Sequence, residues 1–243
     1  IADCKRILED AVNNDIIEKN VANGIKAKKF AKTERKPLTQ YEDSTVLEVA
    51  LNHKYGLFIL ILRYCGIRPE EAVALTLKDV DLKNKLLNIN KAVSLAKNQP
   101  KVKATKNLKN RKIPIPNFLV EPLQKEIDYR NEVGIKYLFT KETDKYSMLT
   151  KQALKTHLNT FLNVVNQNIT DDNKKIKFTY YQLRHSYCTM LYYANIKIKK
   201  AQELMGHSSA DMVYDIYTHL DEERENANEQ INDYISSKYL TTS

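Results

Sequence analysis

The sequence has few of the residues on which several common kinds of functional site depend. Only five of the 243 residues are glycine, and the closest two, Gly56 and Gly66, lie ten positions apart. A loop that cradles a nucleotide phosphate needs closely spaced glycines, so this scarcity excludes P-loop and dinucleotide-binding sites. The longest apolar run, residues 56–62, stops at Arg63 and is far shorter than the ~20 residues that span a bilayer. We therefore expect no membrane segment.

The cysteines are also few. Cys4, Cys65 and Cys188 are odd in number and far apart, and they form neither a Cys-x-x-Cys pair nor a disulfide framework. This pattern favours free thiols in a reducing cytoplasm and argues against a zinc site. We expect a cytoplasmic protein that holds no metal and needs no cofactor.

Positive charge is concentrated in one stretch of the chain. The net charge is +9, but residues 82–120 contain ten cations and no acidic residue, which leaves −1 for the rest of the chain. The ten cations are Lys83, Lys85, Lys91, Lys97, Lys101, Lys103, Lys106, Lys109, Arg111 and Lys112. So long a stretch without a carboxylate favours a polyanionic partner. Nucleic acid fits better than a membrane surface, because the stretch does not lie on an amphipathic helix.

Helical patterns dominate outside this stretch. Residues 2–21 have helix-like apolar spacing, and the basic residues 26–36 are expected to form a linker. The main domain begins where Thr39 and Glu42 have the spacing of a capping box, with Leu38 placed as a hydrophobic staple. The first helix of the main domain is therefore predicted to start there.

Further helices follow along the chain. The apolar run at residues 57–62 predicts a helix that is central in the core. Gly66 is a plausible end for this helix, and Pro69 is a plausible first residue of the next one. Helices are also predicted at residues 151–165 and 181–194.

The basic stretch itself is expected to be extended. Short β patterns at residues 87–89, 101–105 and 111–115 predict three strands, with turns at residues 98–100 and 107–110. The sequence therefore predicts an α+β fold that is mainly α-helical, with a small three-stranded antiparallel β-sheet.

Four short segments carry residues suited to chemistry on a phosphate. They read CGIRPEE (residues 65–71), YYQLRHS (180–186), LMGHSS (204–209) and IYTH (216–219). The patterns G-x-R-x-x-E, R-H-S, L-x-G-H-S and I-Y-T-H, in that order, resemble the tyrosine recombinases, which include the integrases of phages and conjugative elements. The resemblance extends from Thr39 to about Leu220 and implies the fold of their catalytic domain.

Two arginines in these segments are candidates for binding a phosphodiester. Attack on phosphorus builds negative charge on the non-bridging oxygens, and a guanidinium binds such oxygens bidentately and stays charged. We predict Arg68 and Arg184 in this role. Arg68 could instead form only a surface ion pair with Glu71, one helical turn on. The resemblance implies that Glu71 orients Arg68, so both interpretations can hold together.

The resemblance assigns two further roles. It implies that Tyr217 is the nucleophile, with Tyr214 as the local alternative, because the spacing from His207 is one residue longer than in the usual pattern. A phenol has an ordinary pKa of about 10, so it needs cations and hydrogen bonds to become an effective nucleophile. His207 would donate a hydrogen bond to the scissile phosphate.

A lysine is expected to protonate the leaving 5′-oxygen. Counting back from Ile113, the resemblance places Lys106 at the position of the family's hairpin lysine, and Lys103 and Lys109 are alternatives because this hairpin varies in length. The cations predicted to contact DNA are Lys83, Lys97, Lys101, Lys103, Lys109, Arg111 and Lys112.

One position departs from the family pattern. Tyr181 stands three residues before Arg184, where the family usually has histidine. A tyrosine can donate a hydrogen bond to a phosphate but is a poor general base near pH 7. We keep Tyr181 among the predicted catalytic residues with its role open. His185 points away from Arg184 on the same helix and is expected to be structural.

These features predict a site-specific DNA recombinase, or integrase, of a bacterial mobile element or prophage, which cleaves DNA through a covalent 3′-phosphotyrosyl intermediate. The alternatives are a type IB-like topoisomerase and a non-catalytic DNA-binding regulator. A metal nuclease is the weakest alternative, because the acidic pairs at residues 79–81 and 171–172 have no histidine nearby. The resemblance implies double-stranded DNA as the partner, bound by a homotetramer at the nucleoid.

The resemblance also suggests how the chain is divided. The sequence opens at Ile1 rather than Met, so residues 1–36 are expected to be the remnant of a helical core-DNA-binding domain with a basic linker. Residues 37–243 would then be the catalytic domain. A C-terminal helix from about residue 221 is expected to dock on a neighbouring protomer.

Overall fold

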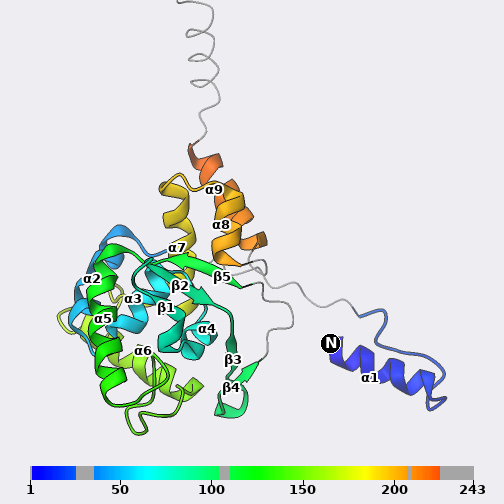
Figure 1. Ribbon diagram of the computed structural model, residues 1–243. Coiled ribbons are helices and arrows are strands. Elements are labelled where there is room, and N and C mark those ends of the chain that lie inside the picture. Colours follow the sequence, from blue (N-terminus) through cyan, green and yellow to red (C-terminus); the bar gives the residue numbers. More distant parts are fainter. Residues whose placement is uncertain (1, 26–35, 104–109, 207–209, 225–243) are drawn as a thin grey trace, which may run out of the picture. The chain divides into compact units, whose positions relative to one another are not determined.

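The computed structural model describes residues 2–25, 36–103, 110–206 and 210–224 (Figure 1). The chain divides into two compact units, Ile1–Glu34 and Arg35–Ser243. Among the described residues, no helix combines the length and the apolar character that crossing a membrane requires.

The first unit contains the helix α1 (Ala2–Asn13), after which the chain turns back along it. The side-chain amide of Asn20 donates to the Lys5 carbonyl at 2.8 Å and to the Glu9 carboxylate at 2.6 Å. Only the first part of the stretch predicted to be helical, residues 2–21, forms a helix. It ends at Asn13, and Asp15 takes a left-handed φ of 55°, which aspartate tolerates better than most residues. Most of the predicted linker lies outside the described residues.

A capping box stands near the start of the described part of the second unit, as predicted. In α2 (Gln40–Asn52) the Thr39 hydroxyl accepts from the Glu42 backbone N–H at 3.3 Å, and the Glu42 carboxylate accepts from the Thr39 N–H at 2.8 Å. Leu38 is buried in front of this helix. The next helix, α3 (Gly56–Tyr64), is buried along most of its length, which confirms its predicted place in the core.

The described residues form two buried apolar clusters, and the larger one surrounds α3. It is built from α2, α3, α4 (Pro69–Ala74), α5 (Asn117–Glu132) and α6 (Lys151–Val165) together with the sheet. The helix predicted at residues 151–165 is α6, so this prediction is confirmed.

A smaller apolar cluster holds three helices of the described residues together. These are α7 (Tyr180–Tyr193), α8 (Ile198–Met205) and α9 (Ala210–Arg224), which lie side by side in Figure 1. The first turns of α7 contribute Leu183 to the larger cluster, and its later turns contribute Tyr187 and Leu191 to the smaller one. α7 therefore joins the two halves of the core. α9 runs through position 221, and the remainder of the expected C-terminal helix lies outside the described residues.

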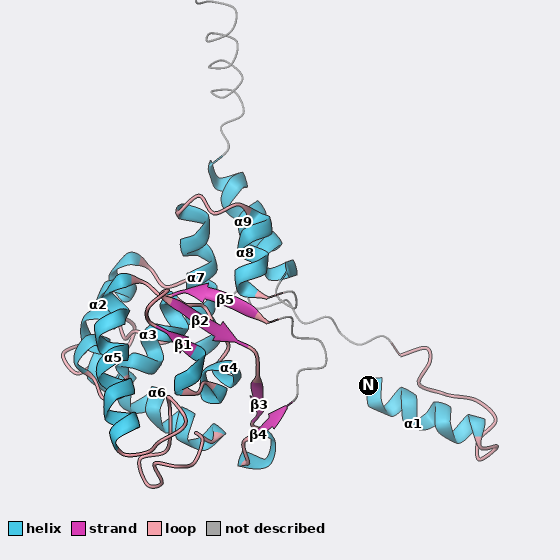
Figure 2. Cartoon of the chain, viewed as in Figure 1, coloured by secondary structure: helices cyan, strands magenta, loops and turns pink. Residues whose placement is uncertain are grey.

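Within the described ranges, the strands form two antiparallel sheets (Figure 2). One has three strands in the order β1 (Val80–Asp81), β2 (Leu86–Ile89) and β5 (Arg111–Pro114), with the short helix η1 (Leu77–Asp79) before it. The other is a two-stranded ribbon of β3 (Ala92–Ser94) and β4 (Lys101–Lys103), joined through η2 (Ala96–Asn98).

The predicted three-stranded antiparallel sheet is thus present, but its predicted membership is wrong. Residues 101–103 pair with β3 in the ribbon, and β1 completes the three-stranded sheet instead. The burial patterns give the reason. β2 and β5 each alternate buried and more exposed positions, whereas all three residues of β4 are exposed and offer the core no apolar face.

Gly66 ends α3 and Pro69 begins α4, as predicted. Gly66 has a left-handed φ of 62°, which favours glycine, and a Cβ at this position would come within 2.0 Å of the Tyr187 ring. The tight passage from α3 to α4 therefore depends on the missing side chain.

Gly66→Ala is expected to destabilise the protein more than Gly134→Ala. Gly134 also has a positive φ, of 71°, but nothing lies within 4 Å of a Cβ added there. The Gly134 variant therefore measures backbone strain alone, about 1–2 kcal/mol. Gly66→Ala adds overpacking against Tyr187, about 1–3 kcal/mol more. Urea denaturation of both variants measures the difference, and equal losses would contradict the close approach of Tyr187.

Candidate functional site

The start of α4 places an arginine and a glutamate side by side. With Pro69 as the first helical residue, Arg68 is the N-cap. The Glu71 carboxylate accepts from the backbone N–H of Arg68 at 2.8 Å and from its Nη1 at 3.0 Å. The predicted contact of Arg68 with Glu71 is present, but the pair does not lie on the surface, because the Glu71 side chain is only 1% exposed.

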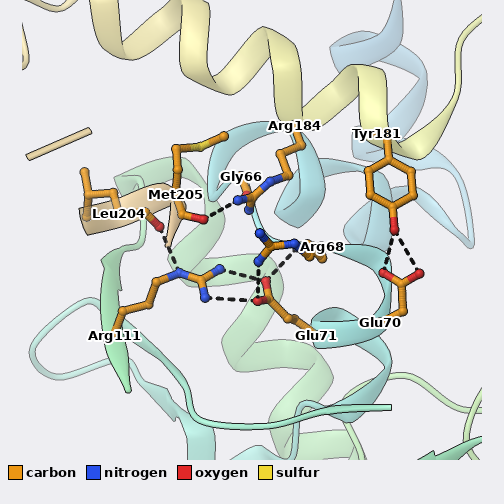
Figure 3. A network of polar contacts seen from close by, with 9 residues as sticks. All are labelled: Gly66, Arg68, Glu70, Glu71, Arg111, Tyr181, Arg184, Leu204 and Met205. Carbon is orange, nitrogen blue, oxygen red and sulfur yellow. Dashed lines mark hydrogen bonds and ion pairs between the residues drawn. The ribbon is translucent and has the colours of Figure 1, made fainter. Parts of the chain in front are cut away.

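A second arginine binds the same carboxylate. Arg111, at the start of β5, donates from Nη1 and Nη2 to the two oxygens of Glu71 at 3.0 and 2.7 Å, and from Nε to the Leu204 carbonyl at 2.9 Å (Figure 3). Burial alone would raise the pKa of Glu71, but the hydrogen bonds and charges of Arg111 and Arg68 hold that pKa below its usual value. Glu71 is therefore an ionised carboxylate between two guanidiniums.

The third arginine comes from α7. Arg184 is 2% exposed and donates to the carbonyls of Gly66 and Met205. Burial, together with the positive charge of Arg68, lowers the pKa of Arg184 to about 9. A negative charge placed beside this guanidinium would favour its charged form.

These four side chains give the site its chemical character. Arg68, Arg111 and Arg184 with Glu71 carry a formal charge of +2 in a largely buried setting. Two of the arginines, Arg68 and Arg184, lie next to each other in Figure 3. Such a cluster suits a bound anion, and guanidiniums match the oxygens of a phosphate in geometry as well as in charge.

Tyr181 lies beside this cluster, in the first turn of α7. Its hydroxyl donates to the two carboxylate oxygens of Glu70 at 2.9 and 3.0 Å. Burial and the negative charge of Glu70 raise the pKa of Tyr181 to about 12, although the charges of Arg68 and Arg184 act in the opposite direction. The phenol therefore keeps its proton at neutral pH.

Tyr217 lies in the smaller apolar cluster rather than in the arginine cluster. It is 6% exposed, its ring meets that of Tyr192 edge to face, and its hydroxyl donates to the Ile196 carbonyl at 2.8 Å. Burial raises the pKa of Tyr217. The alternative nucleophile, Tyr214, lies on the same helix and is 59% exposed.

Five of the seven predicted DNA contacts are exposed, namely Lys83, Lys97, Lys101, Lys103 and Lys112. A sixth, Lys109, lies outside the described residues, as do the predicted catalytic residues Lys106 and His207.

For Arg111 the predicted DNA contact is corrected by the structure. Its guanidinium is buried, and each of its three nitrogens donates to Glu71 or to the Leu204 carbonyl, so it supports other residues of the site instead of facing solvent. A signal for this was present in the sequence. Arg111, Ile113 and Ile115 alternate with Lys112 and Pro114, and the two isoleucines mark the face that points into the core. Glu70 was also missed, because its partner Tyr181 is distant in the sequence.

The acidic residues of the metal-nuclease alternative are held by their own neighbours. Asp79 is 5% exposed and binds the Thr76 hydroxyl at 2.6 Å and the Lys91 ammonium at 2.5 Å. Asp81 binds the side-chain amide of Asn84 at 2.8 Å. Both carboxylates therefore have structural roles in the turns around β1.

Comparisons with known proteins agree on one family. The family model described as "Phage integrase family" matches residues 32–224. A tyrosine recombinase XerA of Pyrococcus furiosus is 30% identical over 216 residues, which cover 85% of this chain and 67% of that protein. A XerC-like tyrosine recombinase of Caldanaerobacter subterraneus is 24% identical over 94% of this chain. The chain spans only 63% of the length of the latter protein.

Solved structures share the fold. The Tn1549 transposon integrase in complex with circular intermediate DNA superposes with a TM-score of 0.70 at 22% identity, over 91% of this chain and 76% of that one. The XerH site-specific recombinase bound to its palindromic difH substrate gives 0.59 at 25% identity, over 89% of this chain and 60% of that one. The predicted fold class, mainly α-helical with a small antiparallel sheet, is confirmed.

Arg111→Met is expected to lower the free energy of unfolding by about 3–5 kcal/mol, because it removes one partner of a buried ion pair and leaves the Leu204 carbonyl without its donor. Lys112→Met, at the neighbouring exposed position of β5, is the matched control and should stay within about 0.5 kcal/mol of the wild type. Chemical denaturation measures both. A similar small change in the two variants would contradict the supporting role of Arg111.

Proposed function

The chain belongs to the phage integrase family, and on that premise we propose that it is a site-specific DNA recombinase that cleaves and rejoins strands through a covalent 3′-phosphotyrosyl intermediate. The observation that carries the proposal is the cluster of Arg68, Arg111 and Arg184 around Glu71. Its excess positive charge suits the phosphate at which a strand is cut.

Double-stranded DNA is the proposed substrate. The exposed lysines on β4, on β5 and in the turns beside them would contact the backbone phosphates. The Tn1549 integrase and XerH structures are DNA complexes, and the XerH structure is described as a post-cleavage complex, which supports the same class of substrate here.

The proposed reaction is an in-line displacement at phosphorus. Arg68 and Arg184 hold the non-bridging oxygens, and His207 donates a further hydrogen bond. The Tyr217 oxygen attacks phosphorus as the bond to the 5′-oxygen breaks, and Lys106 gives the leaving oxygen its proton. Glu71 keeps Arg68 in place throughout. Rejoining is the reverse sequence with a 5′-hydroxyl from another strand.

Tyr217 must change its surroundings before it reacts. Its hydroxyl is bound to the Ile196 carbonyl and its pKa is raised by burial, which is the opposite of what a nucleophile needs. We propose that DNA binding draws this part of α9 toward the arginines, where the cations lower the cost of ionising the phenol.

The wider context of the reaction is proposed on the same basis. The protein would act in the bacterial cytoplasm, as a homotetramer on the attachment sites of a mobile element or prophage. The three free cysteines support a reducing compartment. Residues 1–36 would belong to a core-DNA-binding domain that completes the grip on DNA, and the C-terminal helix would dock on a neighbouring protomer.

The proposal is tested with a nicked suicide DNA that carries candidate attachment sites and traps the covalent intermediate. The wild type should form a protein–DNA adduct that survives denaturing gel electrophoresis. Tyr217→Phe should form none, while its DNA affinity stays close to the wild-type value, because one hydroxyl is lost among many phosphate contacts. Tyr214→Phe is the matched control and should still form the adduct. An adduct with Tyr217→Phe but not with Tyr214→Phe would reverse the assignment of the nucleophile.

DNA binding should weaken steeply with salt. If the five exposed lysines Lys83, Lys97, Lys101, Lys103 and Lys112 each neutralise one phosphate, log K should fall against log[salt] with a slope of about −4.5. Replacing Lys101 and Lys103 together by Gln should make the slope shallower by about 2. Replacing Lys125 and Lys136, outside the basic stretch, should leave it unchanged. Fluorescence anisotropy at several salt concentrations measures the slope, and a flat response would contradict the proposed DNA contacts.

A further inference from the structure

Two helices that begin far apart in the sequence are joined at the edge of the arginine cluster by a pair of side chains. Tyr181, in the first turn of α7, donates its hydroxyl to Glu70, in the first turn of α4, at 2.9 and 3.0 Å (Figure 3). Tyr181 is 41% exposed, so part of this residue remains accessible to a ligand at the site. The pair therefore lies where a bound phosphodiester would meet the ends of both helices.

This hydrogen bond determines whether the Tyr181 hydroxyl can donate a hydrogen bond to a ligand or only accept one. An ionised carboxylate only accepts hydrogen bonds, and a phenol has a single hydrogen to donate. Since that hydrogen is directed at Glu70, the lone pairs of the Tyr181 oxygen can serve only as acceptors. A phosphate oxygen is itself an acceptor, so Tyr181 cannot donate a hydrogen bond to it while its hydrogen is directed at Glu70.

An accepting oxygen can instead bind a hydroxyl group that must lose its proton. The nucleophile of the proposed reaction is such a group, and it has to approach the phosphorus beside Arg68 and Arg184. Tyr181 stands one helical turn before Arg184 on α7, which places both side chains on the same side of that helix. The phenol of Tyr181 also lies close enough to Arg68 and Arg184 for their charges to act on it.

We propose that Glu70 is a positioning residue that makes Tyr181 a proton acceptor for the attacking hydroxyl. As the Tyr217 oxygen bonds to phosphorus, its proton passes to the Tyr181 oxygen, and the Tyr181 proton passes to the Glu70 carboxylate. Tyr217 gives up one proton, Tyr181 gains one proton and loses one, and Glu70 becomes a neutral acid. The electron pair of the broken P–O bond stays on the 5′-oxygen, which takes its proton from Lys106. Rejoining returns the proton along the same path. This inference rests on the proposed recombinase function.

The direction in which Glu70→Ala changes the rate of adduct formation separates this role from phosphate binding by Tyr181. Glu70→Ala releases the Tyr181 hydrogen. If Tyr181 served the phosphate as a donor, that release would leave adduct formation unchanged or faster. The proposed relay predicts instead that single-turnover adduct formation on the nicked suicide DNA slows by about 10- to 100-fold, in the range of general base catalysis.

The relay also predicts coupling between the two residues. Tyr181→Phe should slow adduct formation by a similar factor, and the double variant should be no slower than the slower single variant, because both changes interrupt one path. DNA affinity and thermal stability should stay near the wild-type values in all three. Glu121→Gln, an exposed carboxylate change on α5, is the control. Multiplicative losses, or a loss of adduct that follows a loss of DNA affinity or of folding, would overturn the relay.

A modified DNA tests which proton is being moved. With sulfur in place of the bridging 5′-oxygen, the leaving group needs no proton, so a residue that only protonates the leaving group becomes dispensable. The losses in Glu70→Ala and Tyr181→Phe should persist on this DNA, because the relay acts on the nucleophile, and recovery of the wild-type rate would overturn it. The wild-type adduct is measured first. Its absence would refute the recombinase function itself, whereas a normal adduct with a full-rate Glu70→Ala refutes only the relay.

Discussion

One buried carboxylate, that of Glu71, organises the positively charged site. Each of its oxygens accepts two hydrogen bonds, one from Arg68 and one from Arg111. Arg68 comes from the cap of α4 and Arg111 from β5, so a single ion-pair network sets the spacing between a helix start and a strand. Without this carboxylate the guanidiniums would repel each other in a setting where water screens them poorly. The orientation of Arg68 therefore depends, through Glu71, on a strand residue forty positions after that glutamate.

Two of the arginines, Arg111 and Arg184, also connect the two apolar clusters. Arg111 binds the Leu204 carbonyl and Arg184 binds the Met205 carbonyl, at the C-terminal end of α8. The last carbonyls of a helix lack partners within the helix and carry partial negative charge, so cations are stabilising there. This contact fixes the end of α8, from which the chain continues toward His207. Groups suited to holding a phosphate thus also hold the smaller cluster, which contains Tyr217, against the rest of the domain.

Features that depend on neighbours in the sequence could be predicted, and those that depend on distant partners could not. The capping box at residues 39–42 and the contact between Arg68 and Glu71 follow from spacings of three residues. Arg111 is one of ten cations in the basic stretch, and its alternation with Ile113 and Ile115 indicates the inward face of the strand, but its buried partner Glu71 on α4 could not be predicted from that spacing. The I-Y-T-H motif singled out Tyr217, but apolar spacing alone gives no reason for its hydroxyl to bind the Ile196 carbonyl.

The central claim is that the arginine cluster around Glu71 receives the scissile phosphate. A structure of the covalent adduct trapped on nicked DNA tests it most directly. The account predicts a phosphorus bonded to the Tyr217 oxygen, with guanidinium nitrogens of Arg68 and Arg184 at hydrogen-bond distance, about 2.7–2.9 Å, from its non-bridging oxygens. A phosphate attached to another residue, or one held by the exposed lysines with Arg68 and Arg184 uninvolved, would contradict it.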